Sequence, residues 1–283
     1  MSSLNKYKSQ KAAQNPDHLT YQLIAVDLDG TLLDSSGQPA PGVEEAIRAA
    51  RDCGLRIALI SGRGLLGALP MVKRFNLEGL FVASGGAIIA EAPHGNLIDH
   101  RPISLRSANK LARLGHAEHL VVYFEHPEWL LSEADGEKLE NETHAFGYRL
   151  TVVNDLARAA PSAPSKVTMF GDPDRLAHLI ELLNNQNSSF NYFQTLPQYL
   201  DIYGKNVNKG SALIRLSRYL GIPLRRVIAI GDYYNDLDMF RVAGMSVAMG
   251  NAPLEVRQAA QRVAPGNDEG GAAWAIMSAM SGS

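Results

Sequence analysis

The chain has 283 residues, of which 46% are hydrophobic and 20% are charged, and its formal net charge is −2 at pH 7. This composition suits a folded protein of one or two domains and provides no overall basic field that would attract nucleic acid. The sequence contains one cysteine, no signal-peptide core and no apolar run of the roughly 20 residues that a membrane helix needs, so we expect a cytoplasmic protein without an intrachain disulfide.

The first part of the chain alternates apolar segments with helical patterns. The polar stretch 1–19 precedes it and is expected to be disordered. We expect strands over residues 21–28 and 55–61, a third strand that opens into a glycine-rich turn within residues 79–89, and helices over residues 41–53 and 65–76. Pro70 is expected to bend or break the second helix, and Cys53 to be a small core residue. Near-continuous apolar strands that alternate with helices are typical of a parallel sheet covered on both faces.

The pattern changes after about residue 88 and the alternation resumes from about residue 191. Between these points we expect strands over 119–125, 128–133, 148–153 and 166–171, and helices over 136–147 and 172–186, the last one capped by Asp172. Beyond them we expect helices over 206–221 and 269–280 and strands over 225–232 and 245–250. The sequence therefore predicts an α/β fold: a doubly wound, Rossmann-like parallel-sheet core (residues 20–88 and 191–283) interrupted by an inserted α+β cap domain (residues 89–190).

Polar residues follow the ends of the predicted core strands. They are Asp27, Asp29, Ser61, Ser84 and Asp232. Because ligands of doubly wound sheets bind beyond the carboxyl ends of the strands, we expect these residues to share one site. Carboxylates are costly to bury unless they are paired or bound to a cation, and Mg²⁺ commonly uses one or two carboxylates together with phosphate oxygens. The three aspartates therefore indicate a magnesium site.

The same residues suit phosphoryl transfer. A carboxylate can be the nucleophile that forms an aspartyl-phosphate, and a second acid can protonate the leaving oxygen and then deprotonate water. The reaction also needs positive charge and N–H donors around the phosphoryl group. Lys209 at one predicted helix start can supply the charge, and Ser61 and Gly62 at another can supply hydroxyl and backbone donors.

Each of these motifs also has a simpler explanation. A single pair of aspartates one residue apart more often marks a turn, and a calcium-binding EF-hand loop is a specific alternative for the segment that begins at Asp27. The EF-hand interpretation fails because an apolar strand precedes the motif and because Gln38 stands where that loop needs a glutamate. Lys166 is expected to be a solvated residue at the edge of a cap strand rather than a substrate contact. The functional interpretation is favoured because the motifs stand in order at the expected element ends.

Four segments, DLDGTLLD, LISGR, NKG and GDYYNDLDM, resemble the four motifs of the haloacid dehalogenase superfamily. The insertion between the second and third motifs resembles the large α/β cap, of the C2 type, in the Cof-type phosphatase branch. The resemblance covers nearly the whole chain from about residue 21, and the first and fourth motifs are highly specific in combination. One departure is that Ser84-Gly85-Gly86 stands where Cof-type members usually have an Asn-Gly pair, so that Gly85 replaces the asparagine.

The resemblance implies a role for each matching residue. Asp27 would be the nucleophile, and Asp29 the general acid and base. Mg²⁺ would be held by the Asp27 carboxylate, the Asp29 backbone carbonyl and Asp232, with Asp236 supporting the metal shell. The remaining residues would contact the phosphoryl group or the rest of the substrate: Thr31, Ser61, Gly62, Lys209 and Asn235 for the phosphate, and Arg63 and Ser84 for the substrate.

The residues and the resemblance together predict a Mg²⁺-dependent phosphatase that hydrolyses small phosphorylated metabolites through an aspartyl-phosphate. Sugar phosphates, nucleotides and phosphorylated cofactors are all open as substrates, and neither nucleic acid nor a membrane is an expected partner. A phosphomutase, and a phosphometabolite-binding or regulatory protein with weak catalysis, remain alternatives. Dehalogenation is less favoured, because Asp29 suits the protonation of an alkoxide, which the departure of a halide does not need.

Overall fold

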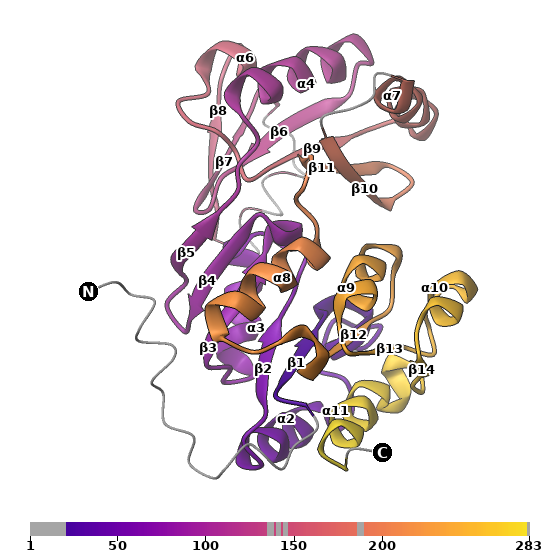
Figure 1. The fold of residues 1–283 in the computed structure, drawn as a ribbon. Coiled ribbons are helices and arrows are strands. Elements are labelled where there is room, and N and C mark those ends of the chain that lie inside the picture. The colour runs from indigo at the N-terminus through magenta and orange to yellow at the C-terminus, as the bar shows by residue number, and fades with distance from the viewer. Residues whose placement is uncertain (1–20, 135–138, 140–142, 144–146, 186–189, 282–283) are drawn as a thin grey trace.

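The computed structural model describes residues 21–281 apart from 135–138, 140–142, 144–146 and 186–189. The expected extension at residues 1–19 and most of the expected helix at residues 136–147 lie outside the described residues. The described part of the chain forms two bodies, a core and a cap, and the cap sits over one end of the core (Figure 1).

The core is built on a five-stranded parallel sheet with the strand order β14-β13-β12-β1-β2. Its strands are β1 (Leu23–Val26), β2 (Arg56–Leu59), β12 (Val227–Gly231), β13 (Met245–Ala248) and β14 (Arg262–Val263). The residues of the interior strand β1 alternate between two buried clusters, Ile24 and Val26 in one and Leu23 and Ala25 in the other. Burial on both faces explains why this strand is a continuous apolar run in the sequence.

Helices cover both faces of this sheet (Figure 1). On the face of Ile24 lie α2 (Val43–Asp52), α3 (Leu65–Arg74) and α11 (Gly271–Ser281), and on the face of Leu23 lie α8 (Lys209–Leu220), α9 (Leu237–Val242) and α10 (Leu254–Ala259). The fold is therefore the doubly wound α/β core that the alternation of strands and helices predicts.

Residues 79–89 form the predicted strand and glycine-rich turn, followed by the start of a second strand. The strands β3 (Gly79–Ala83), β4 (Ile88–Ala92) and β5 (Asn96–His100) form an antiparallel sheet. A bridge between Ile60 and Val82 joins β3 to the end of β2. The chain reverses at Ser84, Gly85 and Gly86, whose φ angles are all positive (48°, 60° and 111°), a region that glycine adopts readily.

The cap contains a six-stranded sheet with the order β10-β11-β9-β6-β7-β8. Its strands are β6 (Val121–Glu125), β7 (Trp129–Ser132), β8 (Arg149–Val152), β9 (Lys166–Phe170), β10 (Phe190–Leu196) and β11 (Tyr199–Gly204). Residues from one face of this sheet pack with α4 (Leu105–Ala117), α6 (Leu156–Ala159) and α7 (Pro173–Asn185) in a separate hydrophobic cluster. A mainly antiparallel sheet with helices on one face is the predicted α+β arrangement.

The sequence patterns do not predict α4, β10 or β11. The predicted domain boundaries also separate strands that pair in the same sheet. β10 and β11 pair within the cap sheet although they follow residue 190, and β4 and β5 pair with the core strand β3 although they follow the expected boundary at residue 88. We therefore propose that the inserted domain runs from α4 to β11 rather than over residues 89–190.

Local predictions about single residues have mixed outcomes. α3 continues through Pro70 without a break. Asp172 caps α7 as predicted, since its Oδ1 accepts hydrogen bonds from the N–H groups of Asp174 (3.0 Å) and Arg175 (3.3 Å). The expectation for Cys53 is wrong, because this residue ends α2 outside its buried stripe and is exposed. Within the part of the chain that the structure describes, every helix is too short or too polar to cross a membrane.

A buried histidine lies in the turn between β6 and β7. His126 is 2% exposed, and its ring stacks on Trp129 with the ring centres 3.6 Å apart. Burial, and after it the nearby His100, lowers the pKa of His126 to about 4 from an ordinary value of 6.5. The folded state therefore disfavours the proton that the unfolded state binds below pH 6.5.

We predict that acidification destabilises the fold through His126. Because the folded pKa lies below the unfolded pKa, this histidine costs the folded state about 2 kcal/mol more at pH 5 than at pH 7. In the variant His126→Phe, which retains a ring against Trp129, the difference in unfolding free energy between these pH values should shrink by that amount. Urea unfolding at both pH values measures it, and an equal pH dependence in both proteins would refute the prediction.

Candidate active site

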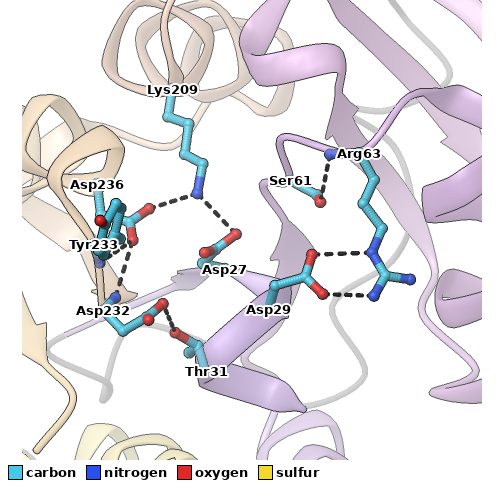
Figure 2. A network of polar contacts seen from close by, with 9 residues as sticks. All are labelled: Asp27, Asp29, Thr31, Ser61, Arg63, Lys209, Asp232, Tyr233 and Asp236. Carbon is cyan, nitrogen blue, oxygen red and sulfur yellow. Dashed lines mark hydrogen bonds and ion pairs between the residues drawn. The ribbon is translucent and has the colours of Figure 1, made fainter. Parts of the chain in front are cut away.

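The two central strands of the core place an aspartate each at the same edge of the sheet. Asp27 directly follows β1, and Asp232 directly follows β12. These strands are parallel neighbours, with Val26 paired to Ile230, and the N–H of Asp27 donates to the carbonyl of Ile230 at 2.9 Å. The predicted meeting of the two acids at one edge is therefore what the structure shows (Figure 2).

A third aspartate completes a cluster of carboxylates. Asp27, Asp232 and Asp236 each direct one ligand oxygen into a group whose atoms all lie within 4.8 Å of one another. Asp236 is fully buried, and its Oδ2 accepts hydrogen bonds from the N–H groups of Asp232 (2.9 Å) and Tyr233 (3.1 Å). These two bonds fix the loop that follows β12.

Lys209 supplies positive charge to this cluster. It is the first residue of α8, which Asn208 caps, and it is only 1% exposed. Its Nζ lies 2.8 Å from Asp27 Oδ1 and 2.7 Å from Asp236 Oδ1 (Figure 2). Burial alone would lower the pKa of this lysine, but Asp236 and Asp27 outweigh burial and raise it above the ordinary value. Lys209 is therefore a permanent cation in the site.

The three carboxylates outnumber the one ammonium group. Burial raises the pKa of Asp27 well above its ordinary value in spite of Lys209, and burial together with Asp236 raises the pKa of Asp232 to about 7. Burial is the largest cause of both shifts, and the neighbouring carboxylates add to it. A set of carboxylate oxygens with excess negative charge suits a hard divalent cation.

The backbone of Gly30 lies close to the Asp232 carboxylate. A methyl group on Gly30, whose φ is +73°, would lie 2.8 Å from the carboxyl carbon of Asp232, so glycine is required there. Thr31 is fully buried, and its hydroxyl donates to Asp232 Oδ1 at 3.0 Å, which orients that carboxylate. The structure thus gives Thr31 a direct contact with the acidic cluster, and its predicted contact with the phosphate stays a prediction.

Asp29 lies apart from the three-carboxylate cluster. Its oxygens accept two hydrogen bonds from Arg63, one from Nε (2.9 Å) and one from Nη2 (2.5 Å), and its side chain is 56% exposed (Figure 2). Such a bidentate pair fixes the orientation of a carboxylate as well as stabilising its charge. Arg63, predicted to face the substrate, therefore contacts the predicted acid and base.

The loops after β2 and β3 are joined to each other. Ser61 is fully buried and its hydroxyl accepts the N–H of Arg63 at 3.0 Å. The N–H of Ser84 donates to the Arg63 carbonyl at 2.7 Å, and the N–H of Gly85 to the Ser61 carbonyl at 3.0 Å. A methyl group on Gly62 would have no neighbour within 4 Å among the described residues, so the space beside this loop is open.

Two asparagines border the site. The buried Oδ1 of Asn235 has no hydrogen-bond partner among the described residues. An amide oxygen accepts hydrogen bonds or binds a cation, so the predicted contact of Asn235 with the phosphate stays a prediction. The sequence analysis missed Asn251, whose Nδ2 donates to the Gly30 carbonyl at 2.9 Å and lies 3.5 Å from Asp232 Oδ2. Its position just beyond the carboxyl end of β13 is the signal that could have identified it.

Comparisons with known proteins identify a family, relatives and solved structures to which this chain is similar. A family model described as haloacid dehalogenase-like hydrolase matches residues 24–276, a range that includes every residue of the site. The HMP-PP phosphatase of Cronobacter sakazakii is 30% identical over 234 residues, which are 82% of this chain and 85% of that protein. The 5-amino-6-(5-phospho-D-ribitylamino)uracil phosphatase of Bacillus subtilis is 27% identical over 264 residues, which are 90% of this chain and 94% of that protein. A solved haloacid dehalogenase-like hydrolase from Bacteroides thetaiotaomicron has a TM-score of 0.80 and 29% identity, and the match covers 90% of this chain and 98% of that chain.

We predict that Lys209→Met destabilises the protein in the absence of added metal. The variant leaves the two buried carboxylates of Asp27 and Asp236 without their cation, which should lower the unfolding free energy by about 3–5 kcal/mol. Adding Asp236→Asn to this variant should restore part of the loss, because one buried charge is then removed. Urea unfolding measures both changes, with Lys205→Met, an exposed lysine of the same segment, as the control. Equal stability of the two single variants would contradict the prediction.

Proposed function

The chain belongs to the family of haloacid dehalogenase-like hydrolases and is a phosphatase of that family, and we propose that it hydrolyses small phosphorylated metabolites with Mg²⁺ through an aspartyl-phosphate. The observation that carries the proposal is the position of Asp27, a buried carboxylate held by Lys209 where β1 and β12 end together. A protein that only binds phosphorylated compounds would need neither this nucleophile nor a second acid beside it.

Asp27 takes the role of nucleophile. Its Oδ1 accepts from Lys209, and we assign the attack on phosphorus to its other oxygen, Oδ2. The bond from Oδ2 to phosphorus forms while the bond from phosphorus to the ester oxygen breaks, and the electron pair of that bond goes to the ester oxygen. The Lys209 ammonium group, the Ser61 hydroxyl and the backbone N–H groups of that loop stabilise the charge on the phosphoryl oxygens.

Asp29 takes the role of general acid and base. It donates a proton to the departing ester oxygen and then removes a proton from the water that attacks the aspartyl-phosphate, which releases inorganic phosphate and restores Asp27. Arg63 acts as its positioning residue, because the bidentate contact determines where the carboxyl group points. The half-exposed side chain of Asp29 is open to a leaving group.

The acidic cluster takes the role of the Mg²⁺ site. The Asp27 carboxylate, Asp232 and the Asp29 backbone carbonyl would hold the ion, and Asp236 supports them by accepting the N–H groups of Asp232 and Tyr233. When bound, Mg²⁺ would neutralise negative charge on the phosphoryl oxygens. The excess of carboxylates over ammonium groups supports a divalent rather than a monovalent cation.

Small phosphorylated metabolites are the proposed substrate class. Two relatives are named as phosphatases of HMP-PP and of 5-amino-6-(5-phospho-D-ribitylamino)uracil, which are small molecules. The cap supports the same class, because it contacts the core beside the site: the Ser84 hydroxyl donates to Glu125 of β6 at 2.6 Å. A covered site favours a small substrate over a folded protein.

We predict that Asp27→Asn abolishes turnover and leaves the protein folded. The amide cannot form the acyl-phosphate, so phosphate release from para-nitrophenyl phosphate should fall by roughly a thousandfold or more. Asp52→Asn, at an exposed position in α2, serves as the matched control and should retain the rate of the parent protein. A rate within a few-fold of the parent for Asp27→Asn would exclude Asp27 as the nucleophile.

We predict that Mg²⁺ stabilises the fold through Asp232. At a concentration about a hundred times its dissociation constant, the ion should raise the unfolding free energy by about 2.7 kcal/mol, because it binds only the folded state. Asp232→Asn should lose most of this stabilisation, whereas Asp174→Asn, an exposed position in α7, should not. Thermal unfolding across a Mg²⁺ titration measures the effect without a substrate. An unchanged Mg²⁺ response in Asp232→Asn would show that the ion binds elsewhere.

A further inference from the structure

The two faces of the cap sheet differ in chemistry. Phe124, Val167 and Ile202, from β6, β9 and β11, belong to the hydrophobic cluster that α4 and α7 cover. The alternate residues of these strands point to the opposite face, and three of them are charged: Glu125, Lys166 and Asp201. The helices α4 and α7 lie on the side of the sheet away from the core, so the charged face is turned toward the core (Figure 1).

These three charged side chains are buried. Glu125, Lys166 and Asp201 are 5%, 6% and 8% exposed, so the expectation of a solvated Lys166 is wrong. Lys166 Nζ lies 3.3 Å from Glu125 Oε2 and 3.3 Å from Asp201 Oδ2. Because two carboxylates flank one ammonium group, the group carries one net negative charge when both carboxylates are ionised. Burying such a group without a stabilising ligand is costly, which points to a function beyond packing.

Hydroxyl groups surround the charged group. Thr168 donates to Asp201 Oδ1 at 2.6 Å, and the Tyr203 hydroxyl lies 3.4 Å from Asp201 Oδ2. On the other side, the Ser84 hydroxyl of the core donates to Glu125 Oε1 at 2.6 Å. These side chains therefore offer both donors and acceptors at close spacing, a pattern that matches hydroxyl groups, since each hydroxyl can donate one hydrogen bond and accept others.

The charged group adjoins the proposed phosphate site. Ser84 and Gly85 donate their N–H groups to the carbonyls of Arg63 and Ser61, so the loop that contacts Glu125 also holds the loop beside Asp29. Tyr203 packs over Gly85, where a methyl group would lie 2.5 Å from the tyrosine ring. The glycine that replaces the asparagine of related chains thus makes room for a cap side chain at the edge of the site.

We propose that Glu125, Lys166 and Asp201 form the subsite for the leaving group, and that they select a phosphate ester whose leaving group carries hydroxyls and no second anionic group. The proposal rests on the phosphatase function proposed above. Hydroxyls of the leaving group bind the carboxylates and the ammonium group, whereas a second phosphate meets a net negative charge in a poorly solvated space. A subsite that binds a diphosphate would, by contrast, not repel the second phosphate group.

Matched pairs of substrates test the proposal. We would measure kcat/KM for glucose 6-phosphate against glucose 1,6-bisphosphate, and for fructose 6-phosphate against fructose 1,6-bisphosphate, with para-nitrophenyl phosphate as a substrate without hydroxyls. The monophosphates should be preferred by about tenfold in each pair. Turnover of para-nitrophenyl phosphate combined with equal or better use of the bisphosphates overturns the subsite and leaves the phosphatase function intact. Absence of turnover for every ester overturns both.

Charge variants separate recognition from a structural role. Asp201→Asn makes the group neutral and should lower the preference for the monophosphate, whereas Lys166→Met makes it more negative and should raise that preference. Lys166→Arg keeps the charge and should keep the preference, which guards against a folding defect. Glu181→Gln removes a negative charge from the exposed side of α7 and should change neither the ratio nor the activity. A ratio that is the same in Asp201→Asn and Lys166→Met refutes the proposal.

Discussion

One buried ammonium group holds the site together. Lys209 contacts Asp27, which follows the first strand of the core, and Asp236, which follows β12. Because Lys209 is also the first residue of α8, the same contacts determine where the chain returns from the cap to the core. The position of the helix, the alignment of the two strand ends and the spacing of the three carboxylates therefore depend on one another. Breaking this arrangement is costly, because Lys209, Asp27 and Asp236 are all buried.

The sequence predicted the site better than it predicted the orientation of individual side chains. Asp27 and Asp232 could be placed because each follows an apolar strand, and parallel strands bring their carboxyl ends to one edge. The contact between Asp29 and Arg63 could not be predicted, because it depends on the direction of a side chain in a loop. The glycine-rich turn at residues 84–86 could be predicted from its composition, but the positive φ angles that reverse the chain there are known only from the structure.

The cap was the harder part to predict. Lys166 was expected to be solvated because the alternation along a strand indicates two faces but not what covers each of them. In the structure the second face is covered by the core, which comes from segments distant in sequence. The glycine at position 85 has a similar explanation. Because it has no side chain, it leaves space on the core for Tyr203 of the cap, and this is seen only when both bodies are considered together.

The insertion of the cap has a consequence for how the protein is made. The strand that precedes Asp27 lies inside the core sheet between β12 and β2, but β12 and the lysine that pairs with Asp27 come after the whole cap in the chain. During synthesis from the N-terminus, the whole cap therefore leaves the ribosome before β12, the neighbour of β1, and Lys209, the partner of Asp27, have been made. The nascent chain exposes an apolar strand throughout this interval, and no fragment that ends within the cap contains a complete site. Activity therefore appears only late in translation, when the last third of the chain has emerged and closed the sheet.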